Sequence, residues 1–472
     1  MAYISLPVVT VQRDFCDVIR DVDEGIAPVD KFWVSCYKSG ETSVHAKVEV
    51  ELDEVKRDLV RFRAKDGDVE FSEMESGYNV GCKPLDIPPT PVVLSVQDYN
   101  DSERTNPLRP QRISAFDVAP DATRFATGHL DGSVIVYPST ALSSPEPFSN
   151  APKTQQINSS KRKLVSKPHV SNVTSLTFFQ SSRVLLSSGA DFALSILSAE
   201  FPDSWSESTS GLGTRVHPVR VLRGHTRSVT SACILGLGRN IVSSSLDSTL
   251  RLWDVPSGGA FSTVYASSPV LCLCTGARMP TPPDGEDLPA SGSPPPDERE
   301  TPEVAHTVTY AGLQNGSFEV FDMRSKSSIY KSSSTSSVPI NAISHLASQY
   351  LLATGASDGV VTIYDVRSIT APLTLFRRNE ASISDIEFAP QSPSTSSIDG
   401  EGYNVGLAIA TTDGLPYIAS LIPEGPGVQA ELIGVDCDPV RNIRVRAGSG
   451  DYRKKLEVWS ASDDAIVRRY IL

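Results

Sequence analysis

A serine, a histidine and an aspartate lie close together in the stretch 224–254, and these three residue types form the catalytic triad of many hydrolases. In such enzymes the histidine takes the proton of the serine hydroxyl, and the aspartate orients the imidazole. Ser243, however, is not flanked by the Gly-x-Ser-x-Gly turn that exposes a nucleophilic serine, and no set of oxyanion donors is visible around it. We therefore expect no catalytic residue and no enzymatic activity.

The spacing of these residues fits a structural hydrogen-bonding chain instead. His225 precedes Asp247 by 22 positions, Ser243 precedes it by 4, and Trp253 follows it by 6. This is the spacing of a WD repeat, which folds as one four-stranded blade of a β-propeller. We expect Asp247, in a tight turn, to accept a hydrogen bond from His225, and Ser243 to link that imidazole to the indole of Trp253. A buried chain of this kind must be fully paired, because an unpaired member costs about 1–3 kcal/mol.

Degraded copies of the same pattern lie on both sides of the clear repeat. Each copy has an aspartate or an asparagine at the turn position of Asp247, and these turn anchors are Asp131, Asp191, Asn315, Asp358, Asp413 and Asp464. Seven copies predict seven blades. The predicted fold class is therefore all-β: a seven-bladed WD-repeat β-propeller, preceded by a small mixed α/β N-terminal domain.

Residues 1–85 do not fit the blade pattern, although residues 33–37 and 44–52 alternate in polarity as strands do. We expect residues 1–85 to form the small N-terminal domain and residues 86–472 to form the propeller. The last copy stops in what should be the third strand of blade seven, which would leave an open edge. We expect a strand near 91–97 to supply the missing outer strand and close the ring.

Three insertions lengthen the blades beyond the usual 40–45 residues, by about 10 or more each. Residues 140–168 are rich in Ser, Pro and Asn, residues 279–304 are Pro-rich and acidic, and residues 391–403 are rich in Ser and Gly. Such compositions do not bury a core, so we expect flexible inserts. The first insert holds the basic cluster 161–163, which is either a nuclear localisation signal or, as for most short runs of charge, simply solvated.

Charge and cysteine content restrict the partners and the compartment. The net charge of −13 and the pI near 5.1 argue against nucleic acid and against an anionic membrane surface. No apolar run reaches the roughly 18 residues of a membrane span. The 7 cysteines are scattered and match no zinc pattern, so we expect no metal and no cofactor. We expect a reducing compartment, cytoplasmic and nuclear, and a monomer when the protein is free.

Several segments resemble the proteasomal ATPase-associated factor family. They are LGRNIVSSSLDSTLRLWD in the clear blade, GVDCDPV at 434–440, DDAIVRRYIL at 463–472 and FWVSCYKSG at 32–40. The resemblance implies a non-enzymatic assembly chaperone that binds the C-terminal domain of an AAA-ATPase subunit of the proteasome regulatory particle base and controls its assembly. The inserts at 140–168 and 279–304 depart from the compact pattern of that family.

Acidic residues are the candidate partner-binding residues. Loops that join an outer strand to the next blade lie on the same face as the turn anchors, which places Asp436 and Asp438 there, with Asp385 nearby. Acidic groups on that face would attract a basic ATPase surface and speed association. The alternative is that Asp436 and Asp438 only cap a turn.

A second function is a substrate receptor of a cullin-type ubiquitin ligase, with the propeller as a protein-binding platform. Blades four and five end in Phe-Asp-Met-Arg at 321–324 and Tyr-Asp-Val-Arg at 364–367. Both endings resemble the Trp-Asp-x-Arg sequence with which some receptors bind the ligase adaptor. Such endings are common in propellers, so the pattern is unspecific.

Overall fold

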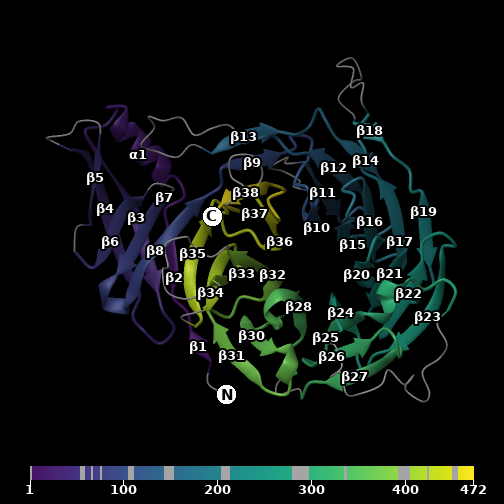
Figure 1. Cartoon of the computed structure of the whole chain (residues 1–472). Coiled ribbons are helices and arrows are strands. Elements are labelled where there is room, and N and C mark those ends of the chain that lie inside the picture. Colours follow the sequence, from purple (N-terminus) through teal and green to yellow (C-terminus); the bar gives the residue numbers. More distant parts are fainter. Residues whose placement is uncertain are drawn as a thin grey trace, which may run out of the picture.

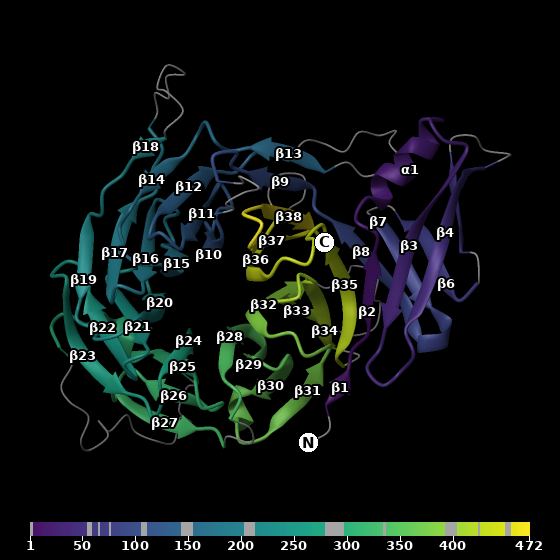
Figure 2. The same cartoon turned by 180° about the vertical axis from the view of Figure 1, so that it is seen from behind.

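The strands form a closed ring of seven blades with a smaller domain at its side, as Figures 1 and 2 show from opposite directions. The computed structural model describes residues 3–53, 59–64, 67–74, 77–104, 111–142, 154–202, 213–278, 297–333, 337–391, 404–422, 425–448 and 455–472. The inner strand of each blade contacts the inner strands of both neighbours, and β36 of the last blade contacts β10 of the first, so the ring is closed. The predicted WD-repeat β-propeller is confirmed.

Each blade is an antiparallel sheet whose strands follow one another from the ring axis outwards. Blades one to three contain β10 (Ile113–Val118), β11 (Arg124–His129), β12 (Val134–Pro138) and β14 (Leu164–Ser166); β15 (Val173–Phe178), β16 (Val184–Gly189), β17 (Ala193–Ser198) and β19 (Arg220–Arg223); and β20 (Val229–Leu235), β21 (Asn240–Ser245), β22 (Thr249–Asp254) and β23 (Gly259–Tyr265).

Blades four to seven follow the same order, except that the outer strand of blade seven precedes blade one in the chain. They contain β24 (Val270–Ala277), β25 (Thr307–Leu313), β26 (Phe318–Asp322) and β27 (Ser327–Lys331); β28 (Ile340–Leu346), β29 (Leu351–Ala356), β30 (Val360–Asp365) and β31 (Pro372–Arg377); β32 (Ile383–Gln391), β33 (Asn404–Thr411), β34 (Tyr417–Ile422) and β35 (Gly427–Ile433); and β36 (Val440–Ala447), β37 (Leu456–Ser462), β38 (Val467–Ile471) and β9 (Gln97–Asn100).

The second strand of a blade is covered by a neighbouring blade on each side, and this explains its composition. β21 is buried along its whole length and reads Asn-Ile-Val-Ser-Ser-Ser. Small hydroxyl side chains fit there because blades pack closely and each hydroxyl can bond to a nearby backbone group. Strands buried on both faces therefore lack the strict polar alternation of a half-exposed strand.

The strand that closes the ring lies later in the sequence than predicted. β9 pairs antiparallel with β38, with Tyr99 opposite Val467, and the Tyr99 ring stacks on Trp459 of β37. Closure by a strand that precedes blade one is as predicted, but the predicted segment 91–97 overlaps that strand only at Gln97, because residues 91–94 belong to β8 (Ile87–Leu94), which runs parallel to β35 of blade six. In β9 the buried Gln97 and Tyr99 alternate with the partly exposed Asp98 and Asn100, as in an outer strand, whereas Val92 of β8 belongs to the core of the N-terminal domain.

The N-terminal domain combines one helix with two sheets: a four-stranded sheet of its own and the strands that extend the sheet of blade six. Its strands are β2 (Val8–Val11), β3 (Val29–Tyr37), β4 (Val44–Leu52), β5 (Val60–Ala64), β6 (Val69–Met74) and β7 (Gly77–Cys82), and η1 (Lys83–Leu85) precedes β8. Helix α1 (Phe15–Asp23) buries Phe15, Val18, Ile19 and Val22, which are spaced to share one helix face, and packs on β3 and β4. Phe15 and Tyr78 meet at 5.4 Å between ring centroids in the core of this domain.

The N-terminal domain is tied to the ring by shared sheets. β1 (Ile4–Ser5) adds to β31 of blade five, and β8 joins β7 to β35, so that one sheet runs from blade six into the N-terminal domain. The predicted boundary between residues 85 and 86 therefore falls inside a continuous sheet. Figure 1 shows the domain beside β34 and β35, at the edge of the ring.

Parts of the predicted flexible inserts have defined structure. β13 (Gln155–Asn158) pairs with β9, β14 is the outer strand of blade one, and β18 (Thr214–Arg215) adds to it. α2 (Pro302–Ala305) follows in the second insert, and η2 (Ala347–Gln349) and η3 (Val366–Ser368) lie in blade five. The remainders of the inserts, 143–153, 279–296 and 392–403, lie outside the described residues. In the described part of the chain, no helix is long and apolar enough to cross a bilayer.

Candidate functional site

The four residues of the clear repeat form one continuous hydrogen-bonded chain. His225 Nδ1 lies 3.0 Å from Asp247 Oδ2, and its Nε2 lies 2.7 Å from Ser243 Oγ. The indole Nε1–H of Trp253 donates to the same Oγ at 2.8 Å. Ser243 and Trp253 are both fully buried. Because the hydroxyl is enclosed and both of its neighbours use it, it cannot reach a substrate, and the group serves the blade structure.

The protonation states agree with this arrangement. Burial lowers the pKa of His225, so the imidazole is neutral near pH 7, donates through Nδ1 to Asp247 and accepts at Nε2 from Ser243. Burial alone would raise the pKa of Asp247, but hydrogen bonds from Thr249, from the backbone N–H of Thr226 and from His225 outweigh it and lower the pKa to about 2. Each donor in the chain therefore has an acceptor.

Blade two carries a shorter version of the same chain. His169 Nδ1 lies 2.9 Å from Asp191 Oδ1, and Nε2 lies 2.7 Å from Ser187 Oγ. Leu197 stands where blade three has Trp253, so the chain ends at the serine. The histidine-to-turn link survives the loss of the aromatic residue.

The turn anchors share one backbone contact. In each of several turns the carboxylate or amide oxygen accepts the N–H of the residue two positions later, which holds the chain in a tight turn. The pairs are Asp131 with Ser133, Asp247 with Thr249, Asn315 with Ser317, Asp358 with Val360, Asp413 with Leu415 and Asp464 with Ile466. These turns and the loops between blades form one face of the ring, which we call the turn face.

The three predicted partner-binding aspartates lie in different surroundings. Asp436 is exposed and pairs with Arg13 of the N-terminal domain at 2.8 Å. Burial and the neighbouring Asp464 and Asp463 raise the pKa of Asp438. Asp385 stays a predicted partner-binding residue, but its carboxylate is engaged within the ring: it accepts from the Asn442 side chain at 3.1 Å and forms an ion pair with Arg444. An early position in an inner strand points a side chain toward the neighbouring blade.

A network of ion pairs connects the inner strands of blades six, seven and one, and the sequence analysis did not predict it. Arg446 bonds to Glu387 of β32 at 3.0 Å and to Asp117 of β10 at 3.1 Å. Arg444, two positions earlier on β36, bonds to the same Asp117 at 3.0 Å and to Asp385. A signal existed in the sequence: charged residues at alternate positions of strands that are otherwise apolar.

A second ion pair corrects the interpretation of the basic cluster. Lys163 is buried, and its Nζ lies 2.7 Å from Asp101 and 2.6 Å from Glu103. The Tyr137 hydroxyl donates to the same Asp101 at 2.8 Å. Of the three basic residues, Lys161 and Arg162 are exposed as predicted, but Lys163 is a structural residue of blade one.

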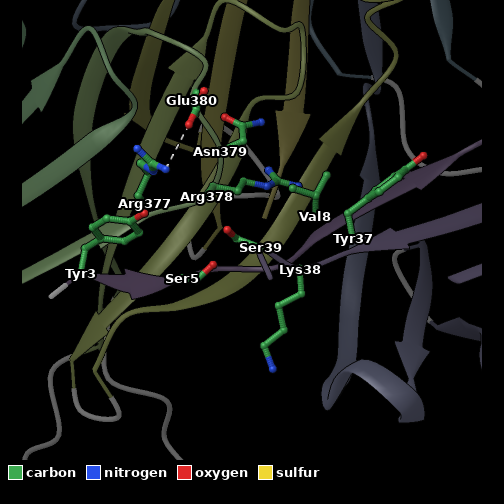
Figure 3. A pocket seen from close by; sticks show the side chains of 10 residues that line it. All are labelled: Tyr3, Ser5, Val8, Tyr37, Lys38, Ser39, Arg377, Arg378, Asn379 and Glu380. Carbon is green, nitrogen blue, oxygen red and sulfur yellow. Dashed lines mark hydrogen bonds and ion pairs between the residues drawn. The ribbon is translucent and has the colours of Figure 1, made fainter. Parts of the chain in front are cut away.

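A cavity of about 280 Å³ opens at the seam between the N-terminal domain and the ring (Figure 3). Its lining residues are Tyr3, Ser5, Val8, Tyr37, Lys38, Ser39, Arg377, Arg378, Asn379 and Glu380. Arg378 is buried and holds Glu431 at 2.5 and 2.7 Å, and the Val9 N–H donates to that carboxylate at 3.1 Å. Arg377 pairs with Glu380 at 3.4 Å. The Arg378–Glu431 pair therefore joins the domain to blades five and six.

Comparison with known proteins supports the WD repeat and finds partial similarity to several named proteins. A model of the WD domain, G-beta repeat, matches residues 216–254, and a model of the nucleolar protein 10-like N-terminal domain matches residues 300–402. Ribosome biogenesis protein YTM1 of Laccaria bicolor is 28% identical over 34% of this chain and 31% of its own length. Pre-mRNA-processing factor 19 of Oryza sativa subsp. japonica is 22% identical over 64% of this chain and 47% of its own length.

A third relative is nucleoporin Nup43 of Homo sapiens, which is 35% identical over 19% of this chain and 23% of its own length. The chain thus spans less than half the length of these relatives. Their names concern ribosome biogenesis, pre-mRNA processing and the nuclear pore. The predicted role as a proteasome assembly chaperone is therefore wrong, and so is the alternative of a cullin-ligase substrate receptor. The cytoplasmic half of the predicted location gains no support from these names.

The sequence resemblance failed for a physical reason. The segments that carried it lie in blade three, in the loop before β36, in the turn after β37 and in β38, and in β3, where buried strands and tight turns restrict the choice of residues. A shared architecture produces such similarity without a shared partner. The repeat match and the closed ring of seven blades show that the chain is a WD-repeat β-propeller protein.

Proposed function

We propose that this chain is a non-enzymatic protein-binding platform that acts in the nucleus during ribosome biogenesis. The observation that carries this proposal is the match of residues 300–402 to the nucleolar protein 10-like N-terminal domain. That range runs from α2 through the last three strands of blade four and the whole of blade five into blade six. The similarity to a ribosome biogenesis protein over 34% of the chain supports the same process.

The geometry supports a platform rather than a catalyst. The Ser243 hydroxyl is enclosed, the arginines of the seam cavity are held in ion pairs within the protein, and the turn face joins loops from all blades into one broad surface. A rigid ring that displays many short loops suits the simultaneous binding of several proteins. The net charge of −13 favours basic protein surfaces, which are abundant in particles assembled on RNA.

Pre-mRNA processing is the second candidate. The similarity to pre-mRNA-processing factor 19 favours it, because that similarity extends over 64% of the chain, although at 22% identity. Both processes assemble ribonucleoprotein particles in the nucleus, so the two candidates differ in the RNA that accompanies the protein.

Rapid depletion of the chain from its native cells tests the proposal. Ribosomal RNA precursors should accumulate within the first cell division after depletion, as measured by pulse labelling, while the splicing of reporter introns stays unchanged. Re-expression of the intact chain should restore processing. If introns are retained while ribosomal RNA precursors stay at normal levels, the function lies in pre-mRNA processing instead. If both precursor levels and intron splicing are normal, the chain has a role in neither process.

A further inference from the structure

The residue that follows the turn anchor has a left-handed backbone in every blade. The φ angles are +81° at Gly132, +71° at Phe192, +62° at Ser248, +81° at Gly316, +84° at Gly359, +80° at Gly414 and +65° at Ala465. This conformation is strained for residues with a Cβ atom, so glycine and small residues suit it. Phe192 is the bulky exception among the seven.

Core packing does not account for Phe192. Its side chain is 44% exposed at the tip of the blade-two turn, where a glycine would complete the same turn without strain. A bulky residue in a left-handed conformation is retained where its side chain has a use, and such residues cluster at binding sites. An exposed aromatic ring at a loop tip offers a large apolar surface that another molecule can bury on contact.

Two more exposed apolar residues lie beside Phe192. Val170 is 89% exposed and Leu130 is 55% exposed. The Val170 N–H donates to Asp191, the neighbour of Phe192, at 3.1 Å, and the His169 N–H donates to the carbonyl of Gly132 at 3.4 Å. The loop between blades one and two is thus fixed between the two turns. Leu130, Val170 and Phe192 therefore lie in neighbouring loops and turns of the turn face, and we call them the apolar triad.

Three basic residues lie in the loop that holds Val170 and in the next loop along the ring. Lys167 lies three positions before Val170, and Arg223 and Arg227 flank the loop that leads into blade three; all three are exposed. Burial lowers the pKa of His169, and the positive charge of Arg223 adds to this effect, which places Arg223 near the triad. Within the described ranges, none of these three cations forms an ion pair with a carboxylate. An apolar patch with a cationic border is therefore exposed on a chain whose net charge is −13.

We propose that the apolar triad and its basic border dock an acidic amphipathic segment of a partner protein. Leucine or aromatic side chains of that segment would contact the triad, and its carboxylates would meet Lys167, Arg223 and Arg227. Val170 and Leu130 are aliphatic and offer no stacking face for a base, which favours a protein over single-stranded RNA. This inference rests on the proposed platform function, but not on its assignment to ribosome biogenesis.

Binding of a designed peptide to the full chain tests this docking surface. The probe is a fluorescein-labelled 18-residue helical peptide with leucine on one face and glutamate elsewhere; the control peptide has lysine in place of glutamate. By fluorescence anisotropy, the acidic peptide should bind and the basic one should not. Phe192→Gly should weaken binding about tenfold, as expected for an aromatic anchor. Binding of both peptides alike, or of neither, would overturn the proposal.

A stability measurement separates docking from folding. Phe192→Gly should leave the melting temperature unchanged or raise it, because glycine relieves the strain at φ +71°. Tyr350→Gly is the matched control: Tyr350 is also an exposed aromatic residue with a left-handed backbone, at φ +56°, but it lies between the first two strands of blade five, on the opposite face. Its replacement should leave peptide binding unchanged.

Three further outcomes would overturn the proposal. They are unchanged binding by Phe192→Gly, an equal loss of binding by Tyr350→Gly, and binding of a 20-nucleotide oligouridine that Phe192→Gly abolishes. If peptide binding fails while depletion still causes ribosomal RNA precursors to accumulate, the docking surface is wrong and the proposed function stands. If peptide binding is as expected while RNA processing is normal after depletion, the docking surface stands and the proposed function is wrong.

Discussion

Arg444 Nε lies 3.0 Å from a carboxylate oxygen of Asp117, although 327 positions separate the two residues in the chain. The contact joins β36 of blade seven to β10 of blade one, next to the seam where β9 completes the last blade. Arg446 repeats the link at 3.1 Å. Two interactions thus close the ring. One is the pairing of β9, which precedes blade one in the chain, with β38 of blade seven, and the other is the set of buried ion pairs between the inner strands β36 and β10.

Arg444→Met should destabilise the propeller strongly. The variant leaves the carboxylates of Asp117 and Asp385 mostly buried without this cation, and breaking a buried pair from one side costs about 3–5 kcal/mol. Chemical denaturation followed by tryptophan fluorescence measures the loss. Arg441→Met is the matched control on the same strand, since Arg441 pairs with Asp463 but is 39% exposed and should contribute less. An equal effect of the two variants would count against the inner network.

Asp247→Ala should lower the stability by about 1–3 kcal/mol, because it removes the carboxylate that accepts from the buried His225. The Asp358→Ala variant removes a turn anchor that accepts from the backbone N–H of Val360 at 3.2 Å, and it should cost less. Thermal melting of both variants provides the comparison. Equal melting temperatures would show that the histidine link adds nothing to the turn.

Lys163→Met should destabilise blade one, whereas Lys161→Met should have no measurable effect. Lys163 is buried against Asp101, and Lys161 is exposed two positions earlier. Loss of one partner of a buried pair costs about 3–5 kcal/mol, while an exposed lysine contributes less than about 0.5 kcal/mol. Denaturant unfolding of the two variants checks this, and a similar midpoint for both would contradict the buried pair.

Stability should fall as the pH drops from 6.5 toward about 4. Burial, with a contribution from Arg104, lowers the pKa of His129 from 6.5 to about 4, so the folded state holds this imidazole neutral where the unfolded chain takes up a proton. The stabilisation is complete above pH 6.5 and is lost progressively below it. Burial also lowers the pKa values of His169 and His225, which adds to the same trend.

His129→Gln isolates this contribution. Melting temperatures of the parent and the variant, measured from pH 8 to pH 4, should converge as the pH falls, because the variant lacks the titrating group. Parallel curves would show that His129 does not titrate between its folded and unfolded pKa values.

The sequence predicted the ring well because a WD repeat is a local pattern. His225, Ser243, Asp247 and Trp253 lie within one blade, and their spacing is set by strand and turn lengths that the chain itself encodes. The turn anchors follow the same logic. Local spacing therefore identified the number of blades, the tetrad residues and the turns.

This local pattern does not predict contacts between residues far apart in the chain. Residues 91–94 and 97–100 can both form a strand, and only the packing of Val92 against the N-terminal domain and blade six decides which of them closes the ring. The pairing of Asp385 with Arg444 and that of Lys163 with Asp101 depend on which blades become neighbours. Partner identity was less accessible still, because turns and buried strands are similar among propellers with different partners.

The most direct test of the account is the composition of particles that copurify with the full chain from nuclear extract. The chain should be recovered with precursor ribosomal RNA and ribosome assembly proteins at moderate salt, and Phe192→Gly should reduce that recovery while Tyr350→Gly does not. Recovery of spliceosomal RNAs without precursor ribosomal RNA, or of no ribonucleoprotein particle at all, would contradict the role in ribosome biogenesis.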